Sequence, residues 1–176
     1  MTENILLLSC CAPCSCAVIK MMAEQNKKFS VVFYNPNIRP YEEYIKRKDE
    51  NKRVCKKYGI NFIELEYDND RWCKEIKGLE NEPERGARCY RCYALRLEET
   101  AKKAKELHIE YFATTLTLSP LKNVEWLNEI GQKVAGRYGL TYLYSDFKKQ
   151  GGYLRSIELS KEYGLYRQDF CGCSFS

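Results

Sequence analysis

Short apolar runs alternate with amphipathic stretches along the whole chain. The apolar runs predict buried strands at residues 5–8, 29–34, 61–66, 111–115 and 141–144. The amphipathic stretches predict helices at residues 13–24, 41–58, 89–107, 123–138 and 153–163. Strands that alternate with helices are typical of an α/β fold with a mainly parallel sheet. We therefore expect a single domain that spans residues 1–176.

The longest predicted helix, at residues 89–107, has one apolar face. The residues at helical spacing that we expect to be buried are Tyr93, Leu97, Ala101, Ala104 and Leu107. The segment before it, residues 78–88, is charged and contains glycine, which predicts a loop.

The chain contains 10 cysteines among its 176 residues, which is more than ordinary usage. A chain of this length can bury a sufficient core without disulfides. Residues 1–9 lack the basic and apolar regions of a secretory signal, and no apolar run approaches the length of a membrane helix. We expect a cytoplasmic protein with no membrane contact, in which clustered thiols bind metal or take part in catalysis.

The predicted topology brings several loops together. In a Rossmann-like sheet the functional crevice lies outside the carboxyl ends of the strands. Cys10 and Cys11 follow the first strand, and residues 35–40 follow the second. Residues 117–120 and 146–149 follow the fourth and fifth strands. All of these segments are expected to meet at one edge of the sheet.

The first cysteine group lies at the turn from the first strand to the first helix. It contains Cys10, Cys11, Cys14 and Cys16 within seven residues. A helix N-terminus favours the thiolate, which is the form that binds metal or attacks an electrophile. We expect Cys16 to pack beneath the sheet, because free cysteine is among the most buried residue types.

The second group is Cys89-Tyr90-Arg91-Cys92, which opens the longest helix. Residues three apart share a helical face, so both sulfurs can point at one metal centre. A single such pair is compatible with zinc, a redox dithiol or an iron–sulfur cluster. Together with Cys10 and Cys11 it supplies four thiolates, the ligand set of zinc sites and of [4Fe–4S] clusters alike.

The third group is Cys171-Gly172-Cys173, near an end of the chain that we expect to be mobile. A disulfide across one residue closes a small strained ring, and strained disulfides tend to be reducible. We interpret the pair as redox-active, the other reading being that it supplies extra metal ligands. Cys55 and Cys73 have no cysteine neighbours and are expected to pack in the core.

Polar residues of the same loops are candidates for substrate binding. Asn35, Asn37 and Arg39 lie in a proline-bounded loop that can contact phosphate or another polar group, and Asp146 can donate a proton or bind a ligand. The net charge is +5, and four basic residues form a candidate footprint for RNA phosphates: Lys148, Lys149, Arg155 and Arg167.

Several blocks of the sequence, in the same order along the chain, match one known family. The blocks are Cys10-Cys11-Ala12-Pro13-Cys14-Ser15, Tyr34-Asn35-Pro36-Asn37-Ile38, Arg88-Cys89-Tyr90-Arg91-Cys92-Tyr93 with Arg96-Leu97, Thr114-Thr115-Leu116 with Ser119-Pro120, and Leu165-Tyr166-Arg167-Gln168 with Cys171-Gly172-Cys173. On these blocks the sequence resembles the QueH-type epoxyqueuosine reductases. The resemblance implies a fold similar to the adenine nucleotide alpha hydrolases. It also implies two-electron removal of the epoxide oxygen of epoxyqueuosine at the tRNA wobble position, the last step of queuosine synthesis.

The resemblance also implies cofactors, partners and residue roles. Cys10, Cys11, Cys89 and Cys92 would hold a [4Fe–4S] cluster, and an additional iron would lie nearby, with Cys14 as a candidate ligand. The family needs no cobalamin. Residues 171 and 173 would form the redox-active pair. The partners would be tRNA that carries epoxyqueuosine in its anticodon loop and an external electron donor such as a ferredoxin or flavodoxin.

Two other functions compete with this one. A tRNA-modifying sulfurtransferase or an ATP-dependent ligase on a related fold would need a glycine-rich phosphate loop after the first strand. Residues 9–14 contain no glycine, which disfavours ATP binding. A zinc-stabilised RNA-binding module would use the same thiols without catalysis.

Overall fold

The computed structural model describes residues 4–175 and contains one parallel five-stranded sheet. The strands are β1 Asn4–Ser9, β2 Lys28–Phe33, β3 Asn61–Glu64, β4 Tyr111–Thr114 and β5 Thr141–Tyr142, in the spatial order β3-β2-β1-β4-β5. All neighbouring pairs are parallel. The α/β class, the mainly parallel sheet and the five strands are therefore confirmed.

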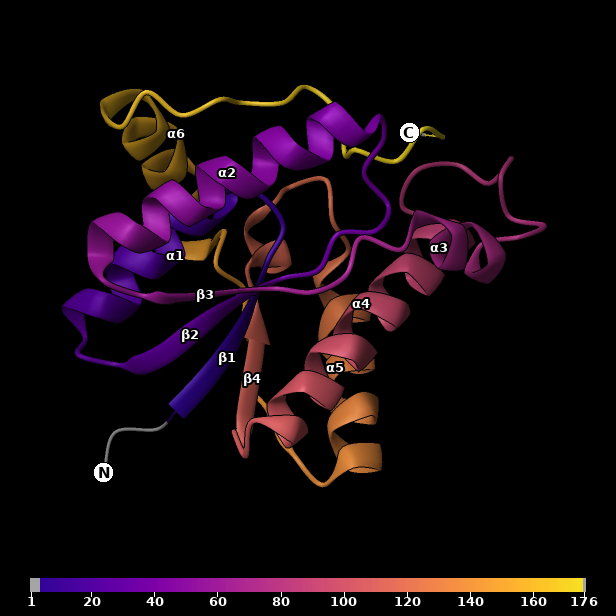
Figure 1. Ribbon diagram of the computed structural model, residues 1–176, viewed down its shortest axis with the longest axis horizontal. Coiled ribbons are helices and arrows are strands. Elements are labelled where there is room, and N and C mark those ends of the chain that lie inside the picture. Colours follow the sequence, from indigo (N-terminus) through magenta and orange to yellow (C-terminus); the bar gives the residue numbers. More distant parts are fainter. Residues whose placement is uncertain (1–3, 176) are drawn as a thin grey trace.

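Helices cover both faces of the sheet (Figure 1). Their bounds are α1 Ala12–Glu24, α2 Tyr41–Tyr58, α3 Asn69–Glu75, α4 Ala87–Glu106, α5 Val124–Tyr138 and α6 Gly152–Glu162, with short 3-10 turns at Thr115–Leu118 and Lys149–Gly151. One face carries α1, α2 and α6, and the other carries α4 and α5 (Figure 1). In the described residues, no helix is both long and apolar enough to cross a membrane.

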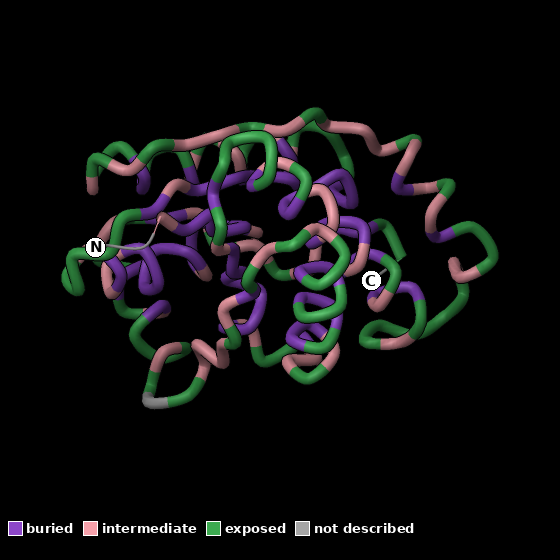
Figure 2. Tube along the Cα trace, turned by 90° about the horizontal axis from the view of Figure 1, so that it is seen from below, coloured by how far each residue is buried: buried purple, intermediate pink, exposed green. Residues whose placement is uncertain are grey.

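The side chains of β1 point alternately into two halves of the core, one on each face of the sheet. Leu6 and Leu8 pack with residues of α4 and α5, whereas Ile5 and Leu7 pack with residues of α1 and α6. This is the expected consequence of a strand whose successive side chains point to opposite faces, both of which are covered by helices. Figure 2 shows the same arrangement from below, with buried positions on the inner side of the helices and exposed positions outside.

The structure differs from the sequence prediction at three places. Helix α3 was not predicted, because a helix of seven residues with one buried side chain, Trp72, has too little periodicity to be recognised. Helix α4 begins at Ala87, inside the predicted loop. Leu107 is 39% exposed, because it follows the last turn of α4, where His108 takes a positive φ and the chain turns away.

The strand order positions the functional site. Strand β1 lies between β2 and β4, and the chain runs outward from β1 in both directions. The loops that leave β1 and its two neighbours therefore separate above the carboxyl end of β1. In open α/β sheets a crevice forms at this switch point.

Candidate active site

A cavity of about 250 Å³ lies at the carboxyl ends of β1, β2 and β4. The loop after β1 and the first turn of α1 contribute Cys10, Cys11 and Cys14, and the loop after β2 contributes Asn35 and Asn37. Further lining comes from Leu116, from residues 119–122, from the C-terminal segment at 167–171 and from single side chains that include Arg47, Arg96 and Tyr153. The sequence prediction that these loops meet at one edge is confirmed, because the loop after β5 packs against the loop after β4, where the amide of Phe147 donates to the Oγ1 of Thr117 at 3.5 Å. Only the other three segments line the cavity.

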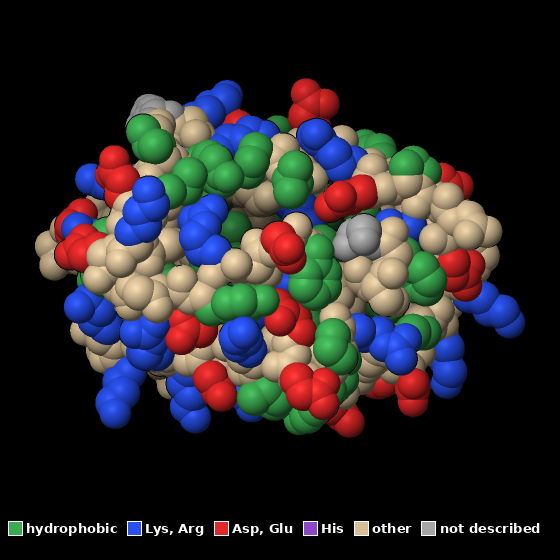
Figure 3. All heavy atoms as spheres, turned by 90° about the horizontal axis from the view of Figure 1, so that it is seen from above, with side chains coloured by type: hydrophobic (Ala, Val, Ile, Leu, Met, Phe, Trp, Pro, Cys, Tyr) green, Lys and Arg blue, Asp and Glu red, His purple; other side chains and the backbone are tan. Residues whose placement is uncertain are grey.

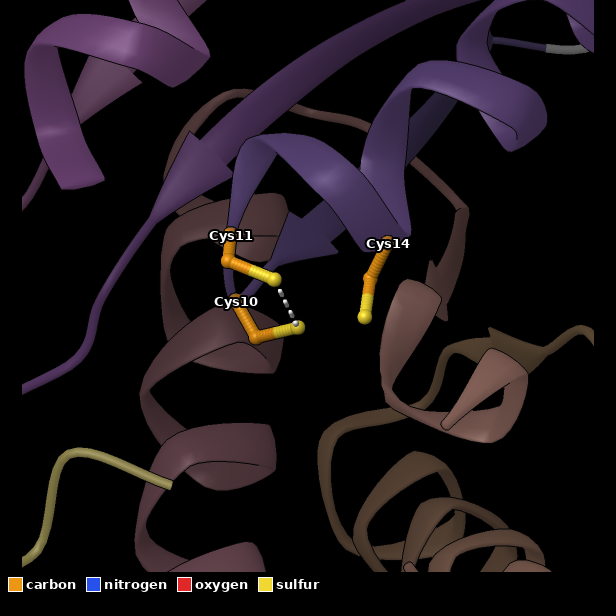
Figure 4. Close-up of side chains that lie close together, drawn as sticks. All are labelled: Cys10, Cys11 and Cys14. Atoms are coloured by element: carbon orange, nitrogen blue, oxygen red, sulfur yellow. Dashed lines mark hydrogen bonds between the residues drawn. The ribbon is translucent and has the colours of Figure 1, made fainter. Parts of the chain in front are cut away.

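Three thiols converge inside the cavity. The Sγ atoms of Cys10, Cys11 and Cys14 lie within 4.8 Å of one another, and those of Cys10 and Cys11 are 3.8 Å apart (Figure 4). Cys11 is the N-cap of α1 in an extended conformation, and Pro13 occupies the first turn, where its missing N–H costs nothing. This sharp entry into the helix turns Cys14 back toward the end of β1.

One of the three thiols is more acidic than the other two. Hydrogen bonding with Cys11 and Cys14 holds the pKa of Cys10 well below its ordinary value. The hydrogen bond to Cys10 raises the pKa of Cys11 to about 12, and the hydrogen bonds to Cys10 and Cys11 raise the pKa of Cys14. Metal ligation requires thiolates, so a cation bound by this group must displace the protons of Cys11 and Cys14.

Arg96 of α4 carries a buried positive charge beside the thiols. It is 2% exposed, and its Nη1 lies 4.0 Å from the Sγ of Cys92. Its Nε donates to the carbonyl of Tyr34 at 3.4 Å, and its Nη2 donates to the side chain of Asn35. Burial disfavours the charged guanidinium, but electrostatic interactions with Cys92 and Cys10 raise its pKa overall. The sequence alone does not predict a role for Arg96, because a single arginine on a helix is expected to point into solvent.

Cys89 and Cys92 lie in the first turns of α4, and both are buried. Cys89 accepts a hydrogen bond from the amide of Arg85 at 3.2 Å, and burial raises the pKa of its thiol. Within the described residues, the sulfur atoms that lie within 4.8 Å of one another at this edge belong to Cys10, Cys11 and Cys14. Neither cysteine of α4 is part of this group. The predicted ligand set of Cys10, Cys11, Cys89 and Cys92 stays a prediction.

A lysine and a cysteine form a close pair in the cavity wall. The Nζ of Lys122 donates a hydrogen bond of 2.9 Å to the Sγ of Cys171, and Lys122 is only 8% exposed. Burial disfavours the charged form of each group. The attraction between them outweighs burial, so the pKa of Cys171 is lowered and the pKa of Lys122 is raised. Lys122 was missed at the sequence level because a single lysine in a loop gives no recognisable pattern.

The C-terminal segment is held firmly against α2, although its end was expected to be mobile. Arg47 donates hydrogen bonds to the carbonyls of Cys171 at 2.7 Å and Phe170 at 3.0 Å. The amide of Arg39 donates to the carbonyl of Gly172 at 2.8 Å. Gly172 has a φ of 114°, and a Cβ atom there would come within 2.9 Å of Arg47. Only glycine fits between the two cysteines.

The predicted substrate-binding residues fall into two groups. Asn35 and Asn37 are buried and line the cavity, and the Oδ1 of Asn37 has no hydrogen-bond partner within residues 4–175. The side chain of Arg39 is exposed and does not line the cavity. Asp146 also lies outside the lining, and its Oδ2 is 3.8 Å from the Nζ of Lys149. Contacts of Arg39 and Asp146 with a substrate stay predictions.

The remaining predicted cysteines lie away from the three thiols of the cavity. Cys16 and Cys55 are fully buried in the half of the core beneath α1, as expected for packing residues. Cys73 is half-buried in α3 and donates to the Oδ1 of Asn69 at 3.6 Å. Cys173 is buried and joins the half of the core beneath α4.

The fold and the cavity together define a Rossmann-like α/β enzyme whose candidate site is built from thiols and three buried cations, Arg47, Arg96 and Lys122. Comparison with known families makes this class specific. The family model for epoxyqueuosine reductase QueH matches residues 5–176. This chain belongs to the QueH family of epoxyqueuosine reductases and is thus an oxidoreductase.

Curated relatives match over nearly the whole chain. Epoxyqueuosine reductase QueH of Acinetobacter baylyi is 42% identical over 175 residues, which cover 99% of this chain and 80% of that protein. The QueH protein of Haemophilus influenzae is also 42% identical and is covered to 71%. The QueH protein of Thermotoga maritima is 36% identical over 176 residues, which cover 98% of this chain and 90% of that protein.

Solved structures with low sequence identity share the fold. The U34-tRNA thiolase NcsA from Methanococcus maripaludis, solved with its [4Fe-4S] cluster, superposes with a TM-score of 0.64 at 14% identity, over 99% of this chain and 61% of that one. A predicted subunit of tRNA methyltransferase from Methanocaldococcus jannaschii gives 0.63 at 12% identity, over 91% and 76%. These likenesses support the Rossmann-like α/β architecture of this chain.

Proposed function

We propose that this chain removes the epoxide oxygen of epoxyqueuosine at the wobble position of tRNA, by a two-electron reduction that needs a [4Fe–4S] cluster. The observation that carries the proposal is the group of convergent thiols in a cavity of a QueH family member. Cys10, Cys11, Cys89 and Cys92 would hold the cluster, and Cys14 would hold an additional iron. Cobalamin has no part in this proposal.

The donor set fits an iron–sulfur centre. Thiolates are the ligands that such clusters require, and Cys10 and Cys11 present them at the entrance of α1. Arg96 interacts electrostatically with both halves of the proposed ligand set, because Cys92 and Cys10 both raise its pKa. When bound, the cluster would pass single electrons and the additional iron would polarise the epoxide oxygen as a Lewis acid.

The chain's own residues would orient the substrate and supply reducing equivalents. Asn37 offers an unpaired, buried Oδ1 in the loop after β2, suited to accept a hydrogen bond from a polar nucleoside. Cys171 and Cys173 would form the redox-active pair, since a dithiol is the only side-chain arrangement that stores two electrons. An external donor, such as a ferredoxin or flavodoxin, would restore the reduced pair.

The anticodon loop suits this cavity because its bases are already single-stranded and need no duplex melting. Tyr153 and Leu121 line the cavity and remain 38% and 55% exposed, so they can contact an inserted base. Basic and acidic side chains are interspersed on the face that Figure 3 shows, so phosphate contacts would come from single residues. A tRNA substrate places the reaction in the cytoplasm.

Replacing Arg155 and Arg167 by glutamine is expected to weaken tRNA binding. Both side chains are exposed, and Arg167 lines the cavity. If each contacts one phosphate, the slope of log binding constant against log salt falls by roughly 1.4 to 1.8. The measurement is a salt titration of tRNA binding by fluorescence anisotropy. The matched control is the double variant Lys27→Gln, Lys28→Gln at the opposite end of β2. Equal slopes for the two double variants would remove Arg155 and Arg167 from the interface.

The proposed cofactor is tested on anaerobically purified protein. We expect a brown protein that contains iron and acid-labile sulfide, because the cavity thiols favour an iron–sulfur centre over an oxygen-ligated metal. Elemental analysis and a sulfide assay measure both. A colourless protein that holds zinc and no sulfide would contradict the proposal and would indicate the zinc-stabilised RNA-binding module.

A further inference from the structure

Lys122 has a buried ammonium whose closest anionic partner is the thiolate of Cys171, at 2.9 Å. A buried charge is costly unless it is paired, so each group stabilises the charged form of the other. The other titratable groups that act on Lys122 come from α4: Tyr93 and the cation of Arg96. Lys122 also acts on the thiol of Cys89.

The two cysteines of the proposed redox pair have unlike surroundings. The sulfur of Cys171 faces the cavity, Lys122 and Arg96, and the backbone amide of Cys173 also favours its thiolate. Cys173 is buried away from the cavity, and burial raises the pKa of its thiol. The 2.9 Å hydrogen bond from the buried Lys122 therefore marks Cys171 as the thiolate of the reduced pair, and Cys173, which lies outside the cavity, as its protonated partner.

We propose that Lys122 is the second proton source for the deoxygenation and that it releases its proton when Cys171 is oxidised. This inference rests on the proposed function. Formation of the Cys171–Cys173 disulfide from a thiolate and a thiol gives up two electrons and one proton. Cleavage of both C–O bonds of the epoxide, to give an alkene and water, consumes two electrons and two protons. The ammonium of Lys122 supplies the missing proton and becomes a neutral amine.

Charge and position explain why the proton is released at this step. While Cys171 is a thiolate, the ion pair holds the proton on Lys122. Once the sulfur is in a disulfide, a buried ammonium has lost its anion and the cation of Arg96 repels it, so the neutral amine is favoured. Reduction of the disulfide by the external donor and uptake of two protons from solvent would restore the starting state.

The ion pair is tested first on the wild-type holoprotein. Reduced protein is treated anaerobically with iodoacetamide across a pH series, and trypsin cleavage after Arg167 releases a peptide that contains both Cys171 and Cys173. Fragmentation mass spectrometry assigns the alkylation to each cysteine. We expect half-maximal alkylation of Cys171 below the ordinary thiol pKa of roughly 8.5, and that of Cys173 above it. The reverse order would overturn the pairing without any substitution.

Two substitutions separate charge from proton donation. Lys122→Gln is expected to raise the half-maximal pH of Cys171 by at least roughly one unit and to slow single turnover roughly 100-fold. Lys122→Arg keeps the charge, so the half-maximal pH stays low, but the rate falls as in Lys122→Gln because guanidinium does not release its proton. The control Lys52→Gln alters an exposed lysine on the outer side of α2 and should change neither quantity.

Each outcome decides one part of the proposal. Full turnover in Lys122→Arg would overturn proton donation, and an unmoved half-maximal pH in folded Lys122→Gln would overturn the ion pair. A wild-type protein that alkylates as expected but never reduces epoxyqueuosine would refute the proposed function and, with it, the proton transfer, while the Lys122–Cys171 pair would stand.

Discussion

Replacing Cys10 by serine is expected to abolish iron binding and epoxyqueuosine reduction together. Cys10 lies at the carboxyl end of β1, and hydrogen bonding with Cys11 and Cys14 makes it the most acidic of the three thiols. A serine hydroxyl stays protonated near neutral pH and is a poor ligand for iron. Removing a residue that only hydrogen-bonds to a metal ligand typically lowers metal affinity or activity about 10- to 100-fold. Removing a ligand itself should therefore lower iron affinity at least roughly 100-fold.

The matched control for Cys10→Ser is Cys73→Ser. Cys73 is half-buried in α3 and donates only to the side chain of Asn69, a bond that a serine hydroxyl can also make. Its variant should keep wild-type iron, sulfide and turnover. Iron content is read by elemental analysis and turnover by nucleoside mass spectrometry. A Cys10→Ser protein that keeps iron and activity would show that these thiols are not the metal centre.

Replacing Cys171 by serine is expected to preserve the cluster and stop turnover. The fold should tolerate the change, because Arg47 binds the backbone carbonyl of residue 171 and not its side chain. A serine cannot form the disulfide, so the pair cannot deliver its two electrons to the epoxide. We expect no turnover, even with excess reductant.

The control for Cys171→Ser removes another buried sulfur outside the site. Cys55 is fully buried in the half of the core beneath α1, and burial alone raises the pKa of its thiol to about 12. Cys55→Ala should lower stability modestly and leave the number of turnovers unchanged. A Cys171→Ser protein with full cluster content and full multiple turnover would overturn the role of residues 171 and 173 as an electron relay.

Local patterns were sufficient to predict most of the fold. Apolar runs identified every strand, and Gly59 and Gly139 mark the ends of α2 and α5 with left-handed caps, as their places after amphipathic stretches suggest. The meeting of loops after β1, β2 and β4 also follows from parallel topology. The loop after β5 does not line the cavity, because β5 is one strand further from the switch point than β4.

The cationic part of the site could not be predicted. Arg47 lies on a highly charged helix and reads as a solvated residue, yet it is buried and holds the C-terminal segment. Lys122 and Arg96 are likewise single basic residues without a spacing signal. Their roles come from tertiary contacts with residues far away in sequence, such as the bond from Lys122 to Cys171. Cysteine spacing, in contrast, is local and could be interpreted directly.

The convergence of Cys14 with Cys10 and Cys11 was only partly anticipated. Spacing suggests Cys10 and Cys11 as one ligand pair, and the family resemblance makes Cys14 a candidate ligand of a separate iron. The structure groups all three, because the extended N-cap at Cys11 folds the first turn of α1 back over the end of β1. The conformation of that turn depends on backbone angles that residue spacing alone does not define.

The most direct test of the account is the conversion of epoxyqueuosine in tRNA by the anaerobic, reduced wild-type protein. Nucleosides from digested tRNA are separated and identified by mass spectrometry. We predict that epoxyqueuosine loses one oxygen atom to become queuosine, in excess over protein, and that chelation of the iron before the reaction abolishes this conversion. Unchanged epoxyqueuosine after incubation with iron-loaded protein and excess reductant would contradict the account.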